Sequence, residues 1–110
     1  MKRIILAVLL LSIQSFGLVW ADVTQDVQNY LNQGNKTSFR FENNTIQTMA
    51  YLIEGEKGIK VIIDKNIDTK QSFAINLRDQ NFLAYLEMTT QKLGLKYQVV
   101  DSKTIRISKQ

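Results

Sequence analysis

The stretch FRFENNTIQTMAYLIEGEKGIKVII, from Phe39 to Ile63, decides the fold because a second copy of it follows 36 positions later, from Ile75. Each copy opens with alternating apolar residues and continues with apolar residues at helical spacing. Each then ends in a Gly–apolar–Lys–apolar strand opening. The repeat predicts two tandem β-α-β units. Two units are too few for a solenoid, so we expect them to form one compact domain.

In the first copy, a strand is expected over 37–42, with its two phenylalanines on one face. Side chains able to cap the following helix come next, at Asn43, Asn44 and Thr45. One apolar face of that helix is formed by Ile46, Met49, Ala50 and Ile53. We expect Gly58 to end the helix in a left-handed conformation and 59–63 to be a strand covered on both faces.

In the second copy, 71–77 is the expected strand, and 78–81 reads as a turn and a helix cap. The helix follows over about 82–93 and ends at Gly94. Its inward residues are predicted to be Phe82, Tyr85, Leu86 and either Thr89 or Leu93.

Two further strands close the chain, at 95–100 and 104–108, and the short polar connection 101–103 suits a hairpin. The element order is therefore strand, helix, strand, strand, helix, strand, strand. We predict an α+β fold in which two tandem β-α-β units and a closing strand place two helices against small mixed β-sheets.

Residues 1–21 have the layout of a secretory signal peptide. Lys2 and Arg3 precede a ten-residue run, 4–13, broken only by Ser12, and Ala21 ends a suitable cleavage sequence. A membrane anchor is disfavoured because a span needs about 20 apolar residues. We therefore expect an exported protein whose leader is cleaved.

Removing 21 residues from 110 leaves 89, enough for one small domain. We assign 37–110 to that domain and 22–36 to an N-terminal amphipathic helix or arm. The narrow apolar stripe of this segment consists of Val23, Val27, Tyr30 and Leu31. A docked helix and a frayed arm both fit it, since an isolated helix of this length is marginal in water.

Composition excludes several kinds of chemistry. The chain has no histidine and no cysteine, so catalytic triads that need either residue, thiol nucleophiles and disulfides are ruled out. The Asp64-x-Asn66-x-Asp68 spacing is that of a calcium loop's start, but Thr69 stands where the loop needs glycine. We predict a non-enzymatic protein and assign no catalytic residue, no cofactor and no metal ion.

The run from Phe39 to Ser108 resembles the short N-terminal domain of secretins and TonB-dependent outer-membrane transducers, the STN family. The resemblance rests on the order of strands, helices, glycines and the Asp64…Asp68 turn over about 70 residues. Ala50 stands where the family's first helix usually has leucine, and Gly55 interrupts that helix. Family members usually carry further periplasmic modules and a membrane-embedded β-structure, so their channel function is not carried over.

The resemblance implies an adaptor. The chain would be a periplasmic interaction domain or accessory subunit of an outer-membrane secretin system, in secretion or type IV pili, or of a TonB-dependent transport or signalling complex. Its partners would be envelope proteins: a secretin, an inner-membrane platform component or a TonB-system regulator. We expect docking at an exposed strand edge.

The last strand is the expected edge, with Thr104, Arg106 and Ser108 as its partner-binding residues. The charge of Arg106 fits equally well with protecting that edge from aggregation. One alternative is nucleic-acid binding, for example in DNA uptake, through outward cations at Arg40, Lys60, Lys96 and Arg106. This is disfavoured because removal of the leader takes away two cations. The mature chain then has 12 Lys and Arg against ten Asp and Glu, a net charge of only +2. Another alternative is a truncated remnant of a longer secretin or transducer.

Overall fold

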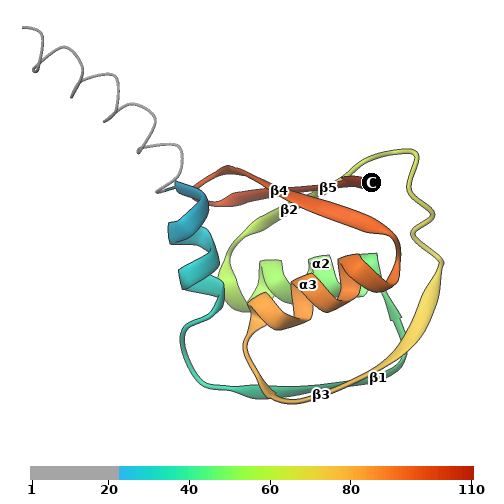
Figure 1. The fold of residues 1–110 in the computed structure, drawn as a ribbon, viewed down its shortest axis with the longest axis horizontal. Helices are drawn as coiled ribbons and strands as arrows, with labels where there is room; N and C mark the ends of the chain where they lie inside the picture. The colour runs from blue at the N-terminus through green and yellow to red at the C-terminus, as the bar shows by residue number, and fades with distance from the viewer. Residues whose placement is uncertain (1–22) are drawn as a thin grey trace, which may run out of the picture.

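Two helices lie between two small sheets in the computed structural model, which describes residues 23–110 (Figure 1). The predicted signal peptide, 1–21, lies outside the described residues. In chain order the elements that follow the N-terminal helix are β1 Thr37–Thr45, α2 Ile46–Lys57, β2 Lys60–Ile63, β3 Ser72–Gln80, α3 Phe82–Lys92, β4 Leu95–Asp101 and β5 Thr104–Lys109. The predicted element order and the α+β fold class are confirmed.

Each β-α-β unit divides its two strands between the two sheets. The first strands, β1 and β3, pair antiparallel in a two-stranded sheet on one side of the helices. The second strands, β2 and β4, lie in a three-stranded sheet of order β2-β5-β4 on the other side. In that sheet β5 runs parallel to β2 and antiparallel to β4, so the sheet is mixed.

The sequence repeat corresponds to a pseudo-twofold arrangement of the strands. In the two-stranded sheet Arg40 pairs with Asn76, which is its own equivalent 36 positions later. In the three-stranded sheet Arg106 pairs with Ile62 on one side and with Gln98 on the other, and these two are again 36 positions apart. The pseudo-twofold axis therefore passes through Arg106, and β5 fills the space between the two halves.

The prediction that the last strand is a sheet edge is wrong. Thr104, Arg106 and Ser108 lie on β5, which is the central strand, with β2 and β4 paired on either side. Ile105 and Ile107 are fully buried against the helices. Since β2 pairs with β5 in parallel and β4 in a hairpin, the free edges of this sheet are those of β2 and β4.

The ends of α2 agree with the sequence prediction, whereas the start of α3 differs from it. The Thr45 hydroxyl accepts a hydrogen bond from Thr48 N, and Gly58 ends α2 at a φ of 67°, as predicted. Asn81 caps α3 by position only: its Oδ1 accepts no hydrogen bond from the helix, and its Nδ2 donates to Asn32 O at 2.7 Å. The predicted turn before it is absent, since 78–80 continue β3, with Asp79 at a φ of 52°.

A buried polar group joins β1 to α3 inside the apolar core. The Tyr85 hydroxyl donates to Asn44 Oδ1 at 2.6 Å, and Asn44 Nδ2 donates to Thr89 Oγ1 at 3.1 Å. All three side chains are fully buried, and the Tyr85 ring stacks on Phe39 at 4.3 Å between centroids. Asn44, predicted as a helix cap, instead fixes the position of α3 relative to β1.

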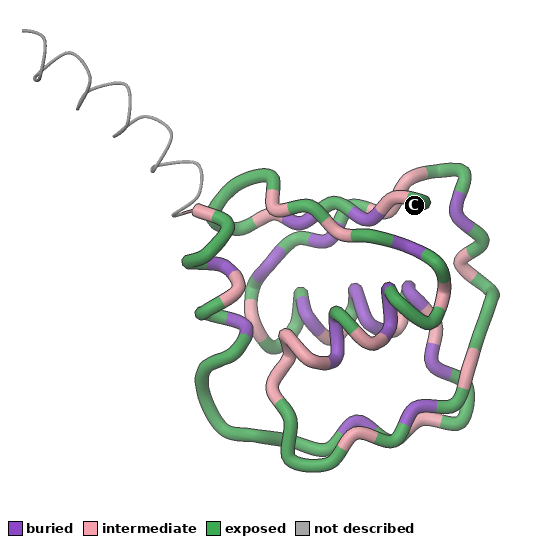
Figure 2. Tube along the Cα trace, in the orientation of Figure 1, coloured by how far each residue is buried: buried purple, intermediate pink, exposed green. Residues whose placement is uncertain are grey.

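Residues 23–31 form a helix that packs across one end of the layers (Figures 1 and 2). Val27 and Leu31 are buried in the core. The Tyr30 hydroxyl donates to Lys57 O at 2.8 Å, and Lys57 Nζ lies over the Tyr30 ring at 4.9 Å from its centroid. These contacts dock the helix onto the C-terminal end of α2. Among the described helices none has the length and apolarity needed to cross a membrane.

Candidate interaction site

The outer face of the three-stranded sheet turns away from the helices and carries three exposed cations, Lys60 on β2, Arg106 on β5 and Lys96 on β4. In register, Lys60 lies opposite Thr104 and Lys96 opposite Ser108, so the three cations cross the sheet diagonally with Arg106 in the middle. Ile62 is also on this face and is 41% exposed. The face is therefore basic, with an exposed apolar side chain beside its central arginine.

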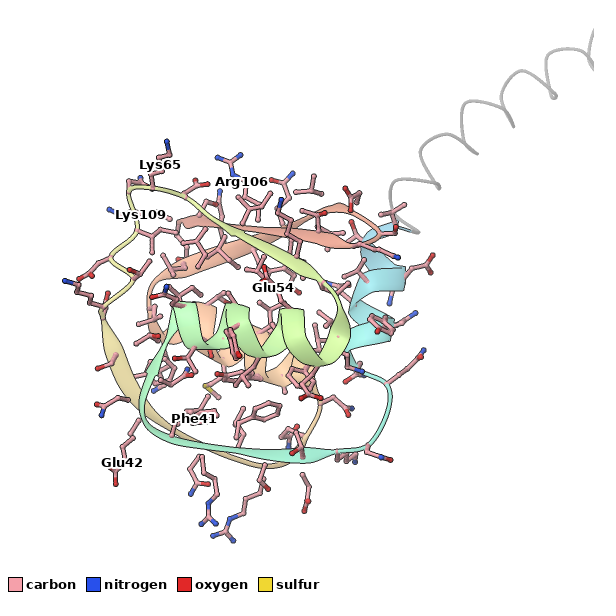
Figure 3. All side chains as sticks on the ribbon, turned by 180° about the vertical axis from the view of Figure 1, so that it is seen from behind. Phe41, Glu42, Glu54, Lys65, Arg106 and Lys109 are labelled. Carbon is pink, nitrogen blue, oxygen red and sulfur yellow. The ribbon has the colours of Figure 1, made fainter. Side chains whose placement is uncertain are left out.

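Arg106 projects away from the helices (Figure 3) and forms a two-pronged ion pair with Asp64. Arg106 Nε donates to Asp64 Oδ1 at 2.8 Å and Nη2 donates to Oδ2 at 3.1 Å. These hydrogen bonds lower the pKa of Asp64 below its ordinary value of 3.8. The guanidinium is thus held toward the β2 side of the sheet, away from β4.

The four cations considered for nucleic-acid binding do not share one surface. Arg40 lies on β1 in the two-stranded sheet, on the opposite side of the helices from Lys60, Lys96 and Arg106. The structure thus brings together three of the four predicted residues.

A helix flanks each free edge of the three-stranded sheet, and the β2 edge is capped by its helix. Glu54 of α2 lies between α2 and β2 (Figure 3), and its Oε1 accepts a hydrogen bond from Val61 N at 2.9 Å. Lys60 N donates to Lys103 O and Asp64 N to Ile107 O, both toward β5. Because backbone groups alternate in direction along a strand, the Val61 amide points away from β5. The carboxylate therefore occupies a donor that a partner strand would need.

The β4 edge lacks this cap. Tyr97 and Thr90 occupy the positions equivalent to Val61 and Glu54, 36 residues further on. The Thr90 hydroxyl donates into its own helix, to Leu86 O at 2.9 Å and Glu87 O at 3.1 Å. Within residues 23–110, no strand pairs with the outer side of β4, and no carboxylate caps the Tyr97 amide in the way that Glu54 caps Val61.

A groove of about 390 Å³ runs between α3 and this open edge. We call it the β4 groove; it is lined by Glu87, Thr90, Gln91, Leu95, Lys96, Tyr97 and Gln110. Gln110 Nε2 donates to Leu95 O at 3.1 Å at the start of β4. Burial raises the pKa of the Tyr97 hydroxyl, which accepts a hydrogen bond from Gln28 Nε2 at 3.0 Å. These side chains can bind neutral polar groups through hydrogen bonds and offer one cation and one carboxylate.

Sequence reasoning missed this edge, although the repeat contains a signal for it. Aligning the two copies puts a glutamate in the first opposite a threonine in the second, at the helix position that faces the following strand. A carboxylate is long enough to reach a strand amide, and a threonine hydroxyl in a helix prefers a backbone carbonyl of its own preceding turn. The asymmetry between a capped and an open edge can be read from that pair.

Among residues 23–110, no three acidic side chains gather in a way that would hold a metal ion. No model of a known protein family matches the chain, and no curated protein matches it.

Proposed function

We propose that this chain is a periplasmic interaction domain, an adaptor or accessory subunit of an envelope complex, which binds a partner protein by adding the partner's strand to the outer edge of β4. The observation that carries the proposal is the difference between the two pseudo-equivalent edges. The Val61 amide on the β2 edge is bound by the Glu54 carboxylate, whereas among residues 23–110 no side chain binds the Tyr97 amide on the β4 edge, which is bordered by a groove. An exposed strand edge offers main-chain hydrogen bonds, and the adjoining groove supplies contacts for alternate side chains.

The kind of complex follows from the resemblance to the short N-terminal domain of secretins and TonB-dependent transducers. Under this proposal the partner is a secretin, an inner-membrane platform component or a regulator of a TonB system. Export by a cleaved leader would bring the chain to the periplasm, where these proteins meet. The role is non-enzymatic because binding needs only the strand edge and its flanking side chains.

Site-specific photo-crosslinking in cells of the native organism tests this proposal. A photoreactive residue is placed at Gln98 on β4 or at Ile62 on β2, which flank Arg106 symmetrically on the same face. The proposal predicts that one envelope protein is captured from Gln98 and not from Ile62, with its cross-linked peptide in an extended segment. Equal capture from both positions, or capture from Ile62 alone, would contradict docking at β4.

A further inference from the structure

The two faces of a strand paired with β4 would meet different chemistry. On the outer face its side chains would lie beside Lys96 and Gln98, both exposed. On the inner face they would lie over the groove, beside Thr90, Tyr97 and Glu87. Since successive side chains of a strand point to opposite faces, these two environments impose different demands on alternate residues of the partner.

The outer face favours carboxylates. In the part of the chain that the structure describes, the ion pair between Arg106 and Asp64 is the only one, so Lys96 has no anionic partner. Lys60 adds to the positive potential of this face, whereas the charge of Arg106 is balanced by Asp64. The inner face offers no net positive charge to a carboxylate, because Glu87 and Lys96 both line the groove and their charges offset each other.

A second copy of this chain is a poor occupant. β4 carries one cation, Lys96, and one carboxylate, Asp101, so a second copy of β4 brings no net negative charge to Lys96. An acidic segment does bring such a charge, and opposite charges across paired strands are stabilising. Charge therefore favours a different, acidic chain.

Building on the proposed function, we infer that the β4 groove binds an extended segment of a partner protein with Asp or Glu at alternate positions. The carboxylates lie beside Lys96 on the outer face, and the intervening neutral side chains lie over Thr90 and Tyr97. Main-chain pairing supplies the affinity, and the alternation of acidic and neutral residues supplies the choice of partner.

The test uses two end-blocked octapeptides, one alternating Thr with Glu and one alternating Thr with Gln, titrated into the isotope-labelled mature protein. Amide shifts in the NMR spectrum report where each peptide binds and how tightly. We expect both peptides to shift the Tyr97 and Val99 amides, and the Glu peptide to bind about threefold or more tightly. The preference should weaken as salt is added.

Two charge reversals provide matched controls. Lys96→Glu should abolish or invert the preference for the Glu peptide. Lys60→Glu makes the same change on the same face at the pseudo-equivalent position, beside the capped edge, and should leave the preference within about twofold.

The possible outcomes distinguish a failure of this inference from a failure of the proposed function. Equal affinity for both peptides, with shifts at Tyr97 and Val99, would overturn the acidic preference and leave strand pairing at β4 standing. An acidic preference that Lys60→Glu removes as fully as Lys96→Glu would also overturn the inference, because binding would then follow the whole basic face. If neither peptide shifts the β4 amides, pairing at β4 is itself contradicted.

Discussion

Replacing Tyr85 with phenylalanine removes one hydroxyl from the buried polar group and little else. The ring keeps its stacking on Phe39 at 4.3 Å, so no large cavity forms. Asn44 Oδ1, which accepts from that hydroxyl at 2.6 Å in a fully buried side chain, loses its donor. Leaving a buried acceptor without a donor costs about 1–3 kcal/mol of unfolding free energy.

Thermal and urea unfolding of the mature protein measure that cost. In a domain of this size each kcal/mol lowers the unfolding midpoint by roughly 4–8 °C. Tyr51→Phe is the matched control, because Tyr51 is 77% exposed and the same substitution there should change the unfolding free energy by less than about 0.5 kcal/mol. If Tyr85→Phe is no more destabilising than Tyr51→Phe, the buried hydrogen bonds do not hold α3 to β1 as argued.

Alkaline pH adds a second signature. Burial raises the pKa of Tyr85 above its ordinary value of 10.0, so the folded protein keeps a proton that the unfolded chain releases. The stability that this hydroxyl contributes is complete below pH 10.0 and is lost as the pH rises above it. Above that pH the difference in unfolding free energy between the wild type and Tyr85→Phe should therefore narrow.

Two further changes test the surfaces of the three-stranded sheet. Glu54→Ala removes the hydrogen bond from the Val61 amide on the β2 edge. If that hydrogen bond contributes about 1 kcal/mol, hydrogen exchange of the amide should become roughly fivefold faster. Glu56→Ala, on the same helix, should leave the exchange rate of that amide unchanged. Asp64→Asn removes the charged carboxylate that Arg106 binds, so it should lower the thermal unfolding midpoint at neutral pH. Because the pKa of Asp64 is lowered below 3.8 in the folded protein, that effect should fade as the pH falls below this value, and an effect that persists in acid would show that the charge of Asp64 is not its source.

Most of the fold could be predicted from the sequence repeat, because apolar periodicity and glycine positions reflect local secondary structure. The left-handed Gly58 and the Thr45 cap were predictable on that ground. The central position of β5 was not. Alternation of Ile105 and Ile107 with polar residues shows that one face is buried, and it is the same for a central and an edge strand.

Long-range partners explain the other differences. Asn44 has the side chain of a helix cap, and only the approach of Tyr85, 41 residues away, makes it part of the core. Asn81 likewise has the side chain of a helix cap, but it makes no capping bond to α3 and its Nδ2 donates to Asn32, 49 residues away. The open edge of β4 is also a property of two elements, since it depends on which side chain of α3 faces the strand.

Hydrogen exchange in a complex tests pairing at β4 most directly. The partner captured from position 98 is purified and mixed with the isotope-labelled mature protein. The hydrogen-exchange rates of individual backbone amides in this complex are then compared with those in the free protein. Strand addition predicts that exchange of the Tyr97 and Val99 amides slows at least roughly tenfold, the slowing expected when an exposed amide gains a hydrogen bond worth about 1.4 kcal/mol, while Ile63 on β2 is unchanged. Protection confined to the two-stranded sheet of β1 and β3, with β4 exchanging as in the free protein, would contradict the account.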